Sequence, residues 1–419
     1  MTTTILAGII FAAIVIQLGI FLLYGFFKAN RNLSHTLTKN DHIPVTHDSP
    51  INLPPDAKSV SNWIEFEVQR REFENKDHSI CSYYLVPVDG KPLPVFSPGQ
   101  YLTFKILIDD PVTQKQKPVI RCYSLSDTPC PDYYRVSIKR VSPPANHPEL
   151  PEGKASSHFH QSIHAGSKLL IKPPSGQFHL NTEEKLPVVL IGGGIGITPM
   201  VSILNTLLQQ KEKREIWLFY AVQNSQSHIM KTHLAALAER NENFHLYVCY
   251  SSPEAEDQLG VDYHHQGRID IPLLRHTLQM TRYQFYICGP SAMMQSMVSG
   301  LQDWGIPDKD IYYESFGPSS IKRTQKTTQP APDSISASIT FSKSNKTVNW
   351  DSSYDSLLEF AEDHHIEIES GCRSGNCGSC QTQVQSGELD LTQSPDFDVP
   401  PGYCLMCIST PRGNLILDA

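Results

Sequence analysis

The chain has 419 residues, 40% of them hydrophobic and 19% charged, and this length is typical of about three domains. The composition excludes a disordered or collagen-like chain, because apolar residues are plentiful and Gly and Pro stay near average usage. A formal net charge of −8 argues against a general nucleic-acid-binding protein.

The negative charge is concentrated in the last fifth of the chain. Residues 336–419 hold 12 acidic and four basic side chains, whereas the rest of the chain holds 31 of each. Such an uneven distribution indicates a separate acidic module at the C-terminal end, with a cationic partner or neighbour.

The first expected element is an apolar stretch over residues 5–27, in which Gln17 is the one strongly polar side chain. As a helix this stretch would reach about 34 Å, enough to cross a hydrocarbon core of about 30 Å. A cleaved signal peptide is the alternative, but the basic residues Lys28 and Arg31 follow the apolar run instead of preceding it. We therefore expect a single-pass transmembrane helix, with a polar linker over residues 28–62 and the bulk of the chain in the cytoplasm.

Two further modules are predicted from their strand and helix patterns. Residues 63–180 contain short β-type runs between turn residues, which predict an antiparallel β-barrel. Residues 186–317 alternate buried strand patterns with helical ones, which predicts a parallel, Rossmann-like α/β domain.

The last module follows a second linker over residues 318–335, which is rich in Ser, Thr, Gln, Lys and Pro. Residues 336–419 begin with a hairpin pattern, and a short helix follows whose expected N-cap is Ser353 or Asp355. The order of these elements predicts an α+β module.

Four cysteines carry the most specific motif of the chain: Cys372, Cys377, Cys380 and Cys407. The first three follow the spacing Cys-x4-Cys-x2-Cys, which is that of plant-type ferredoxins with a [2Fe–2S] cluster, where each iron takes two thiolates. Cys404 competes for the fourth position, and the resemblance of residues 402–407 to the closing motif of ferredoxins favours Cys407. A zinc site is the alternative, but zinc usually takes two matched Cys-x2-Cys pairs. The module thus resembles a β-grasp ferredoxin domain.

The residues Arg-Cys-Tyr-Ser at 121–124 resemble the Arg-x-Tyr-Ser motif of the ferredoxin–NADP reductase superfamily. The planar guanidinium of Arg121 suits a flavin diphosphate, and Tyr123 provides an aromatic wall for the flavin ring. The resemblance implies that Ser124 contacts the redox-active flavin nitrogen. Further flavin contacts implied by the resemblance are Tyr101, Cys122, Ala155, Ser156 and Ser157. The likeness is closest to the reductase half of flavohaemoproteins, without their globin, and it implies FAD as the flavin.

A glycine-rich turn follows the strand pattern at residues 188–191 and precedes a helix, an arrangement that suits a pyrophosphate. The residues expected to bind the nicotinamide cofactor there are Gly193, Gly194, Ile195, Gly196, Thr198 and Pro199. A second set is implied by the resemblance alone: Cys288, Gly289, Pro290, Glu314 and Phe316. In the family the cysteine lies beside the reacting nicotinamide carbon, the carboxylate lies near the hydride path and the aromatic residue shields the flavin. An ordinary core cysteine remains the alternative for Cys288.

The segments expected to meet the adenosine end of the cofactor are residues 222–227 and 251–257. Neither contains Lys or Arg, and the second is acidic. A 2′-phosphate needs cations. The sequence therefore favours NADH over NADPH.

The order of the modules implies a membrane-anchored oxidoreductase that takes hydride from NADH onto FAD, with Ser124, Cys288 and Glu314 at the reacting centre. Electrons would pass singly through the [2Fe–2S] cluster to a protein with a basic docking face, such as an oxygenase, hydroxylase or desaturase. The alternatives are a quinone reductase, a reductase for a hybrid-cluster protein, and a non-enzymatic redox sensor. The intact glycine turn and Cys288 argue against the sensor.

Overall fold

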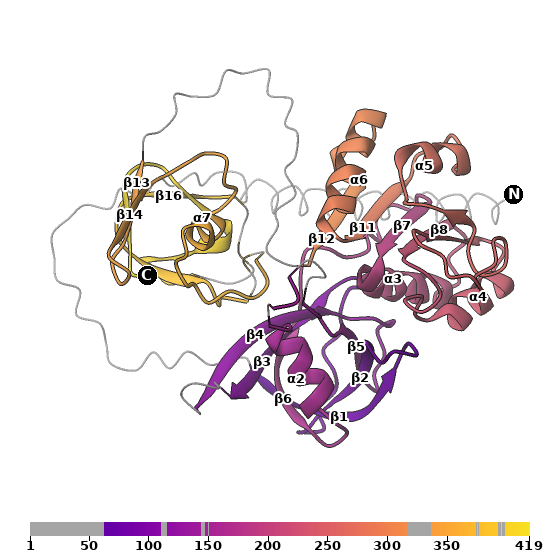
Figure 1. Ribbon diagram of the computed structural model, residues 1–419, viewed down its shortest axis with the longest axis horizontal. Coiled ribbons are helices and arrows are strands. Elements are labelled where there is room, and N and C mark those ends of the chain that lie inside the picture. Colours follow the sequence, from indigo (N-terminus) through magenta and orange to yellow (C-terminus); the bar gives the residue numbers. More distant parts are fainter. Residues whose placement is uncertain are drawn as a thin grey trace, which may run out of the picture. The chain divides into compact units, whose positions relative to one another are not determined.

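The structure is a computed structural model (Figure 1). It describes residues 63–109, 115–143, 147–149, 151–316, 337–373, 375, 377–392, 395 and 399–419. The expected transmembrane helix at 5–27 and the linkers at 28–62 and 318–335 lie outside these residues. Within the described residues, no helix is both long enough and apolar enough to cross a membrane.

Six antiparallel strands form the first sheet, in the order β4-β3-β6-β1-β2-β5. They are β1 (Ile64–Phe73), β2 (Ile80–Pro87), β3 (Tyr101–Asp109), β4 (Gln116–Ser124), β5 (Tyr134–Lys139) and β6 (Lys168–Ser175). A bridge between Leu125 and Val136 joins the chain after β4 to β5, so the sheet curls toward closure. Helix α2 (Lys154–Ser162) adds Phe159 to an apolar core that includes Phe104. The predicted antiparallel β domain is confirmed.

Six parallel strands form the second sheet, in the order β10-β9-β8-β7-β11-β12. They are β7 (Val188–Gly193), β8 (Ile216–Val222), β9 (Phe244–Tyr250), β10 (His265–Gln266), β11 (Gln284–Gly289) and β12 (Ile311–Ser315). The predicted Rossmann-like domain is confirmed. The sequence did not predict β12, because this edge strand is mostly half-buried and lacks a continuous apolar run.

Helices cover both faces of the parallel sheet (Figure 1). They are α3 (Ile197–Gln209), α4 (Lys231–Arg240), α5 (Ile271–Thr277) and α6 (Ser291–Trp304). Helices α3 and α4 share one apolar cluster with the sheet, and α5 and α6 share another. The chain runs from β7 to β8, β9 and β10 on one side, while β11 and β12 lie on the other. This places the switch point of the sheet between β7 and β11, where ligands bind in such folds.

The C-terminal module is a mixed five-stranded sheet in the order β14-β13-β19-β15-β17, with helix α7 (Leu357–Asp363) packed on its apolar side. The sheet strands are β13 (Ser338–Phe341), β14 (Lys346–Asn349), β15 (Gln381–Ser386), β17 (Tyr403–Leu405) and β19 (Leu415–Leu417). A separate pair is formed by β16 (Leu389–Leu391) and β18 (Ser409–Pro411). Strands β13 and β19 run parallel and the other pairs antiparallel, and the predicted β-grasp fold is confirmed.

The predicted N-cap of α7 was wrong. Ser356, and neither Ser353 nor Asp355, accepts the Glu359 amide at 3.2 Å. The Glu359 carboxylate in turn accepts the amide of Asp355 at 3.1 Å. The serine lies three residues before a glutamate, so this is a shifted form of the capping box.

Candidate functional site

The predicted flavin motif lies at the end of β4, and the sheet register sets its neighbours. Ser124 pairs with Tyr101 on β3, so both predicted flavin residues lie side by side and are buried. Tyr123 packs edge-on between Phe104 and Phe159, with ring centroids 5.5 and 5.3 Å away. The ring of Tyr123 is therefore held rigidly by the core, as a wall for a planar ligand requires.

The remaining motif residues differ in exposure. Arg121 is exposed and donates to the carbonyl of Ile120 at 2.7 Å, which leaves other guanidinium donors for an anion. Cys122 lies 3.4 Å from the Thr103 hydroxyl, and burial raises the pKa of its thiol. A protonated thiol at this position carries no charge that would oppose a diphosphate.

The second predicted phosphate segment begins helix α2. Gly153 is its N-cap and provides no side-chain cap, so the first-turn amides have no side-chain partner. Ala155 is buried, and the Ser156 hydroxyl is engaged with the Val141 amide at 3.1 Å and the Gly153 carbonyl at 2.9 Å. Ser157 donates to Glu152 at 2.8 Å. The backbone of this turn, more than its hydroxyls, is available to an anion.

The glycine turn packs against the loop that follows β11. A methyl group on Gly196 would lie 2.3 Å from the carbonyl oxygen of Cys288, and one on Gly193 would lie 2.7 Å from Pro290. A methyl group on Gly289 would lie 3.0 Å from the backbone of Gly193. These positions accept only glycine, because a Cβ would meet backbone or ring atoms.

At Gly194 the backbone conformation, and not close packing, favours glycine. Its φ is +54°, and a methyl group there would meet nothing within 4 Å. Ile195 is half-buried beside it, and the Thr198 hydroxyl donates to the Ile195 carbonyl at 3.0 Å. Pro199 is buried in the first turn of α3. The turn thus presents open space at the N-terminus of α3, which is the geometry that a pyrophosphate needs.

Three predicted catalytic residues meet at the switch point. Cys288 on β11 is the direct ladder neighbour of Glu314 on β12, and of Gly192 on β7. The Ser124 hydroxyl donates to Oε2 of Glu314 at 3.4 Å, across 190 residues of sequence. The hydroxyl, the carboxyl and the thiol therefore belong to one site.

Burial controls the charge of this site. It raises the pKa of Glu314 to about 8, against the opposing effect of the Ser124 hydrogen bond. Burial and then the nearby Glu314 charge raise the pKa of the Cys288 thiol well above its ordinary value. Both groups are consequently neutral at pH 7, which suits a site that receives hydride.

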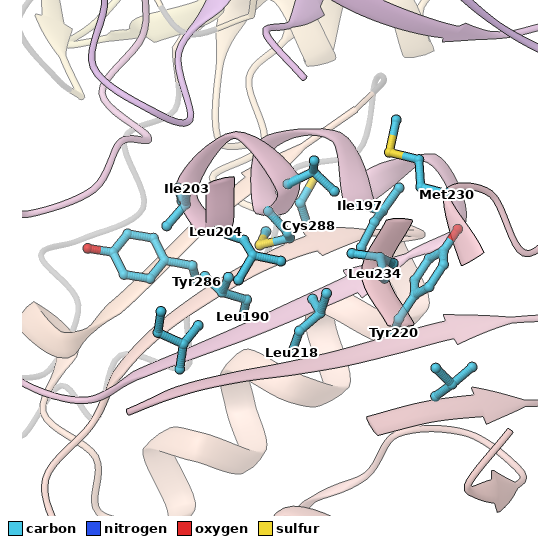
Figure 2. Packing of buried hydrophobic residues seen from close by; sticks show 14 of the residues in the cluster. Leu190, Ile197, Ile203, Leu204, Leu218, Tyr220, Met230, Leu234, Tyr286 and Cys288 are labelled. Carbon is cyan, nitrogen blue, oxygen red and sulfur yellow. The ribbon is translucent and has the colours of Figure 1, made fainter. Parts of the chain in front are cut away.

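Cys288 is also part of the apolar core (Figure 2). Its side chain is 0% exposed and lies among Ile197, Leu204 and Leu190 beneath α3. Cys288 is thus both a residue of the apolar core and the ladder neighbour of Glu314. Phe316, two residues beyond Glu314, is 42% exposed. An exposed aromatic side chain at this edge is free to cover a planar ligand.

The four predicted cluster cysteines form two pairs. The Cys377 amide donates to Sγ of Cys372 at 3.2 Å, and the Cys372 amide donates to Sγ of Cys377 at 3.3 Å. The Cys407 thiol donates to Cys380, which lowers the pKa of Cys380. No group of three or more potential ligands for a single metal ion occurs in the described part of the chain. Two thiol pairs are what a [2Fe–2S] cluster requires, because each iron takes two thiolates.

Glycines shape the cluster loop. A methyl group on Gly371 would lie 2.9 Å from the Cys377 sulfur, and Gly375 has a φ of +78° with Ile408 only 2.7 Å from a built methyl group. Cys404 is buried on β17, opposite Thr382 of β15, and burial raises its pKa to about 12. The competing cysteine therefore belongs to the sheet and its core, whereas Cys407 lies beside Cys380.

Residues that the sequence did not single out connect the two loops expected at the adenosine end. Asn224 after β8 donates to Glu254 after β9 at 2.6 Å. Asp257 accepts the Ser225 and Glu254 amides at 3.3 and 2.9 Å. Desolvation opposes ionisation of Asp257, but these hydrogen bonds lower its pKa overall. These hydrogen bonds join the loops after β8 and β9 and place both carboxyl groups at their junction.

Two families match separate parts of the chain. Residues 190–299 match the oxidoreductase NAD-binding domain, and residues 339–412 match the 2Fe-2S iron-sulfur cluster binding domain. The flavohemoprotein of Halalkalibacterium halodurans is 39% identical over 265 residues, which are 62% of this chain and 62% of that protein. The flavohemoprotein of Bacillus cereus is 40% identical over 266 residues, 63% of this chain and 64% of that protein. The chain thus spans less than two thirds of the length of these relatives.

Solved structures agree with this division. The flavohem-like FAD/NAD binding domain of nitric oxide dioxygenase from Vibrio cholerae O1 biovar El Tor has 29% identity and a TM-score of 0.53, covering 61% of this chain and 99% of that one. Phthalate dioxygenase reductase covers 85% of this chain and 98% of its own at a TM-score of 0.51, and its 24% identity shows the fold alone. As the motifs predicted, the chain contains an NAD-binding domain and a C-terminal [2Fe–2S] cluster binding domain, and it is similar to flavohemoproteins and to a flavohem-like FAD/NAD binding domain.

Proposed function

We propose that the chain takes hydride from NADH onto FAD and passes single electrons through its [2Fe–2S] cluster to an acceptor protein. When bound, FAD accepts two electrons and releases them singly, and the cluster carries one at a time. The observation that carries this proposal is the meeting of Ser124, Cys288 and Glu314 at the switch point of the parallel sheet. A hydroxyl from the flavin domain and two buried, neutral groups from the nicotinamide domain line one site.

The residues of this chain have distinct roles in that reaction. Arg121 and the first-turn amides of α2 hold the flavin diphosphate, and Tyr123 orients the ring. Gly194 admits the pyrophosphate of NADH, and Glu314 holds a proton beside Ser124 at neutral pH. In a bound cluster, Cys372 with Cys377 would ligate one iron and Cys380 with Cys407 the other.

We propose NADH rather than NADPH as the electron donor. The carboxylates of Glu254 and Asp257 lie on one loop and would repel a 2′-phosphate. Lys231, the basic residue nearest in sequence to residues 222–227, pairs with Asp262. Both loops contain no lysine or arginine over residues 222–227 and 251–257.

An oxygenase, hydroxylase or desaturase component is the acceptor class we propose. This rests on the fold shared with phthalate dioxygenase reductase, described as a modular structure for electron transfer from pyridine nucleotides to [2Fe–2S]. The acidic ferredoxin module, with a net charge of −8 over residues 336–419, calls for a basic docking face on that acceptor. Quinone and hybrid-cluster proteins are the alternative acceptors.

Anaerobic mixing of the holoprotein with one equivalent of NADH tests the electron route. Bleaching of the flavin absorbance followed by the electron paramagnetic resonance signal of a reduced [2Fe–2S] cluster is the expected sequence. A flavin that bleaches beside a cluster that stays oxidised would contradict the relay, and a flavin that never bleaches would contradict the reductase. Reduction of the cluster by dithionite controls for an intact centre.

We further propose that residues 5–27 anchor the protein in a membrane with residues 63–419 on the cytoplasmic side. The support is the uninterrupted apolar sequence, followed by Lys28 and Arg31. Fractionation of the full chain and of a variant that begins at residue 61 tests this. Recovery of the full chain in the soluble fraction would overturn the anchor, whereas a shift to the soluble fraction on truncation supports it.

A further inference from the structure

Helix α3, which begins at the glycine turn, carries a polar stripe on a largely buried surface. The stripe occupies helix positions i, i+3, i+4 and i+7 and consists of Ser202, Asn205, Thr206 and Gln209. Ser202 is 0% exposed and Thr206 is 4% exposed. Buried polar side chains require hydrogen-bond partners, so something specific must cover this stripe.

The partners come from two consecutive residues of the flavin domain. The Ser202 hydroxyl donates to the Asp127 carbonyl at 2.7 Å, and the Asn205 amide donates to Oδ1 of Asp127 at 2.9 Å. The Thr206 hydroxyl donates to the Ser202 carbonyl of its own helix at 2.7 Å and lies 3.1 Å from the Thr128 hydroxyl, which donates to Oε1 of Gln209 at 2.8 Å. The turn at residues 127–128 thus contacts all four side chains of the stripe.

The same aspartate is held from its own domain. Oδ2 of Asp127 accepts the Tyr133 hydroxyl at 3.3 Å and lies 3.5 Å from the Arg135 guanidinium. Arg135 also contacts the Ser126 hydroxyl at 3.2 Å, and only 12% of its side chain is exposed. One oxygen of Asp127 therefore faces α3 and the other faces the flavin domain, in a setting with little solvent to weaken either interaction.

The contact between Asp127 and α3 lies close in sequence to both predicted cofactor-binding motifs. Asp127 lies three residues beyond Ser124, and α3 begins directly after Gly196. The contact consequently links the turn that follows the flavin-facing serine to the helix that follows the nucleotide-facing glycine turn. Hydride transfer depends steeply on the distance between donor and acceptor, and a misplacement of about 1 Å costs up to about 100-fold in rate.

We propose that Asp127 is a positioning residue that sets the distance between nicotinamide and flavin by holding α3 against the Arg-x-Tyr-Ser strand. It touches neither cofactor in this assignment and acts through Asn205 and Ser202. The inference rests on the proposed function, since it assumes that NADH reduces the flavin in this chain.

The test compares full-length holoprotein variants in anaerobic flavin reduction at saturating NADH. Asp127→Ala is expected to slow flavin reduction by about 10- to 100-fold and to raise the deuterium isotope effect measured with NADH labelled at the transferred position. Asp127→Asn keeps an acceptor at Oδ1 and is expected to recover part of the rate. Asp132→Ala, an exposed aspartate in the same connection, is the matched control and is expected to reduce at the wild-type rate.

A second variant separates positioning from folding. Asn205→Ala removes the partner on α3, and the double variant with Asp127→Ala is expected to lose little more than either single variant, because both break one interaction. FAD content and melting temperature are measured alongside.

A rate for Asp127→Ala equal to that of Asp132→Ala would overturn the inference while leaving the proposed function intact. So would an unchanged isotope effect with a rate loss that follows FAD content. Absence of flavin reduction in the wild type would overturn the proposed function itself.

Discussion

The Ser124 hydroxyl donates to the Glu314 carboxyl at 3.4 Å, and this single contact joins the last residue of β4 to the penultimate residue of β12. One residue comes from the antiparallel flavin domain and the other from the parallel nicotinamide domain. Under the proposed function this contact lies where the flavin and the nicotinamide meet, and we expect the charge of Glu314 to affect the reaction there.

We expect the rate of flavin reduction by NADH to fall above pH 8 in the wild type. Burial raises the pKa of Glu314 to about 8, so the carboxyl is neutral at pH 7 and ionised above pH 8, where its charge opposes the arriving hydride. Glu314→Gln mimics the neutral form and is expected to remove this fall. Anaerobic stopped-flow rates between pH 6 and pH 10 measure it, and a variant that keeps the wild-type pH profile would refute the assignment.

The raised pKa of Glu314 also makes the folded state less stable as the pH rises. The carboxyl ionises near 4.5 in the unfolded chain and near 8 in the folded one, so the native state is relatively favoured below the first value. This contribution is lost as the pH rises through the second value. Melting temperatures of the wild type are therefore expected to decline relative to those of Glu314→Gln between about pH 5 and pH 8.

Cys407→Ser is expected to abolish the [2Fe–2S] cluster, whereas Cys404→Ser is expected to retain it. Cys407 lies beside Cys380, and Cys404 is a core residue of β17 whose pKa burial raises to about 12. Iron content and visible absorption of the two purified variants show which cysteine is the fourth cluster ligand. Two irons per chain in Cys407→Ser, or none in Cys404→Ser, would reverse the assignment of the fourth ligand.

Glu254→Gln combined with Asp257→Asn is expected to lower the preference for NADH over NADPH by about tenfold in kcat/KM, equivalent to roughly 1.4 kcal/mol. The substitutions remove two carboxylates from the loops expected at the adenosine end while keeping side chains of the same shape that can accept hydrogen bonds. Glu256→Gln, an exposed neighbour, is the matched control. An unchanged preference in the double variant would show that other residues determine it.

Electron transfer from the reduced protein to a basic acceptor protein is expected to slow by about tenfold as ionic strength rises from about 0.02 to 0.3 M. The reason is the net charge of −8 confined to residues 336–419. Rates to a small neutral acceptor serve as the control and are expected to stay constant. A rate of electron transfer to the basic protein that does not change with ionic strength would contradict electrostatic docking.

The cluster loop and the glycine turn could be predicted from the sequence, because the residues that form each of them lie close together in the chain. The spacing of Cys372, Cys377 and Cys380 already brings three thiols onto one loop, and the glycine turn before α3 needs only the strand and helix on either side of it. In each case the residues that must meet are separated by a few peptide bonds, so the spacing itself restricts the geometry.

Only the tertiary structure could bring together residues that lie far apart. Ser124 and Glu314 are 190 positions apart, and strand pairing and domain packing place them in contact. The same holds for Asp127 with the α3 stripe and for Asn224 with Glu254, which no local pattern signals. Burial is likewise a property of the packed chain, and it is the largest cause of the raised pKa of Glu314, which keeps that carboxyl neutral at pH 7.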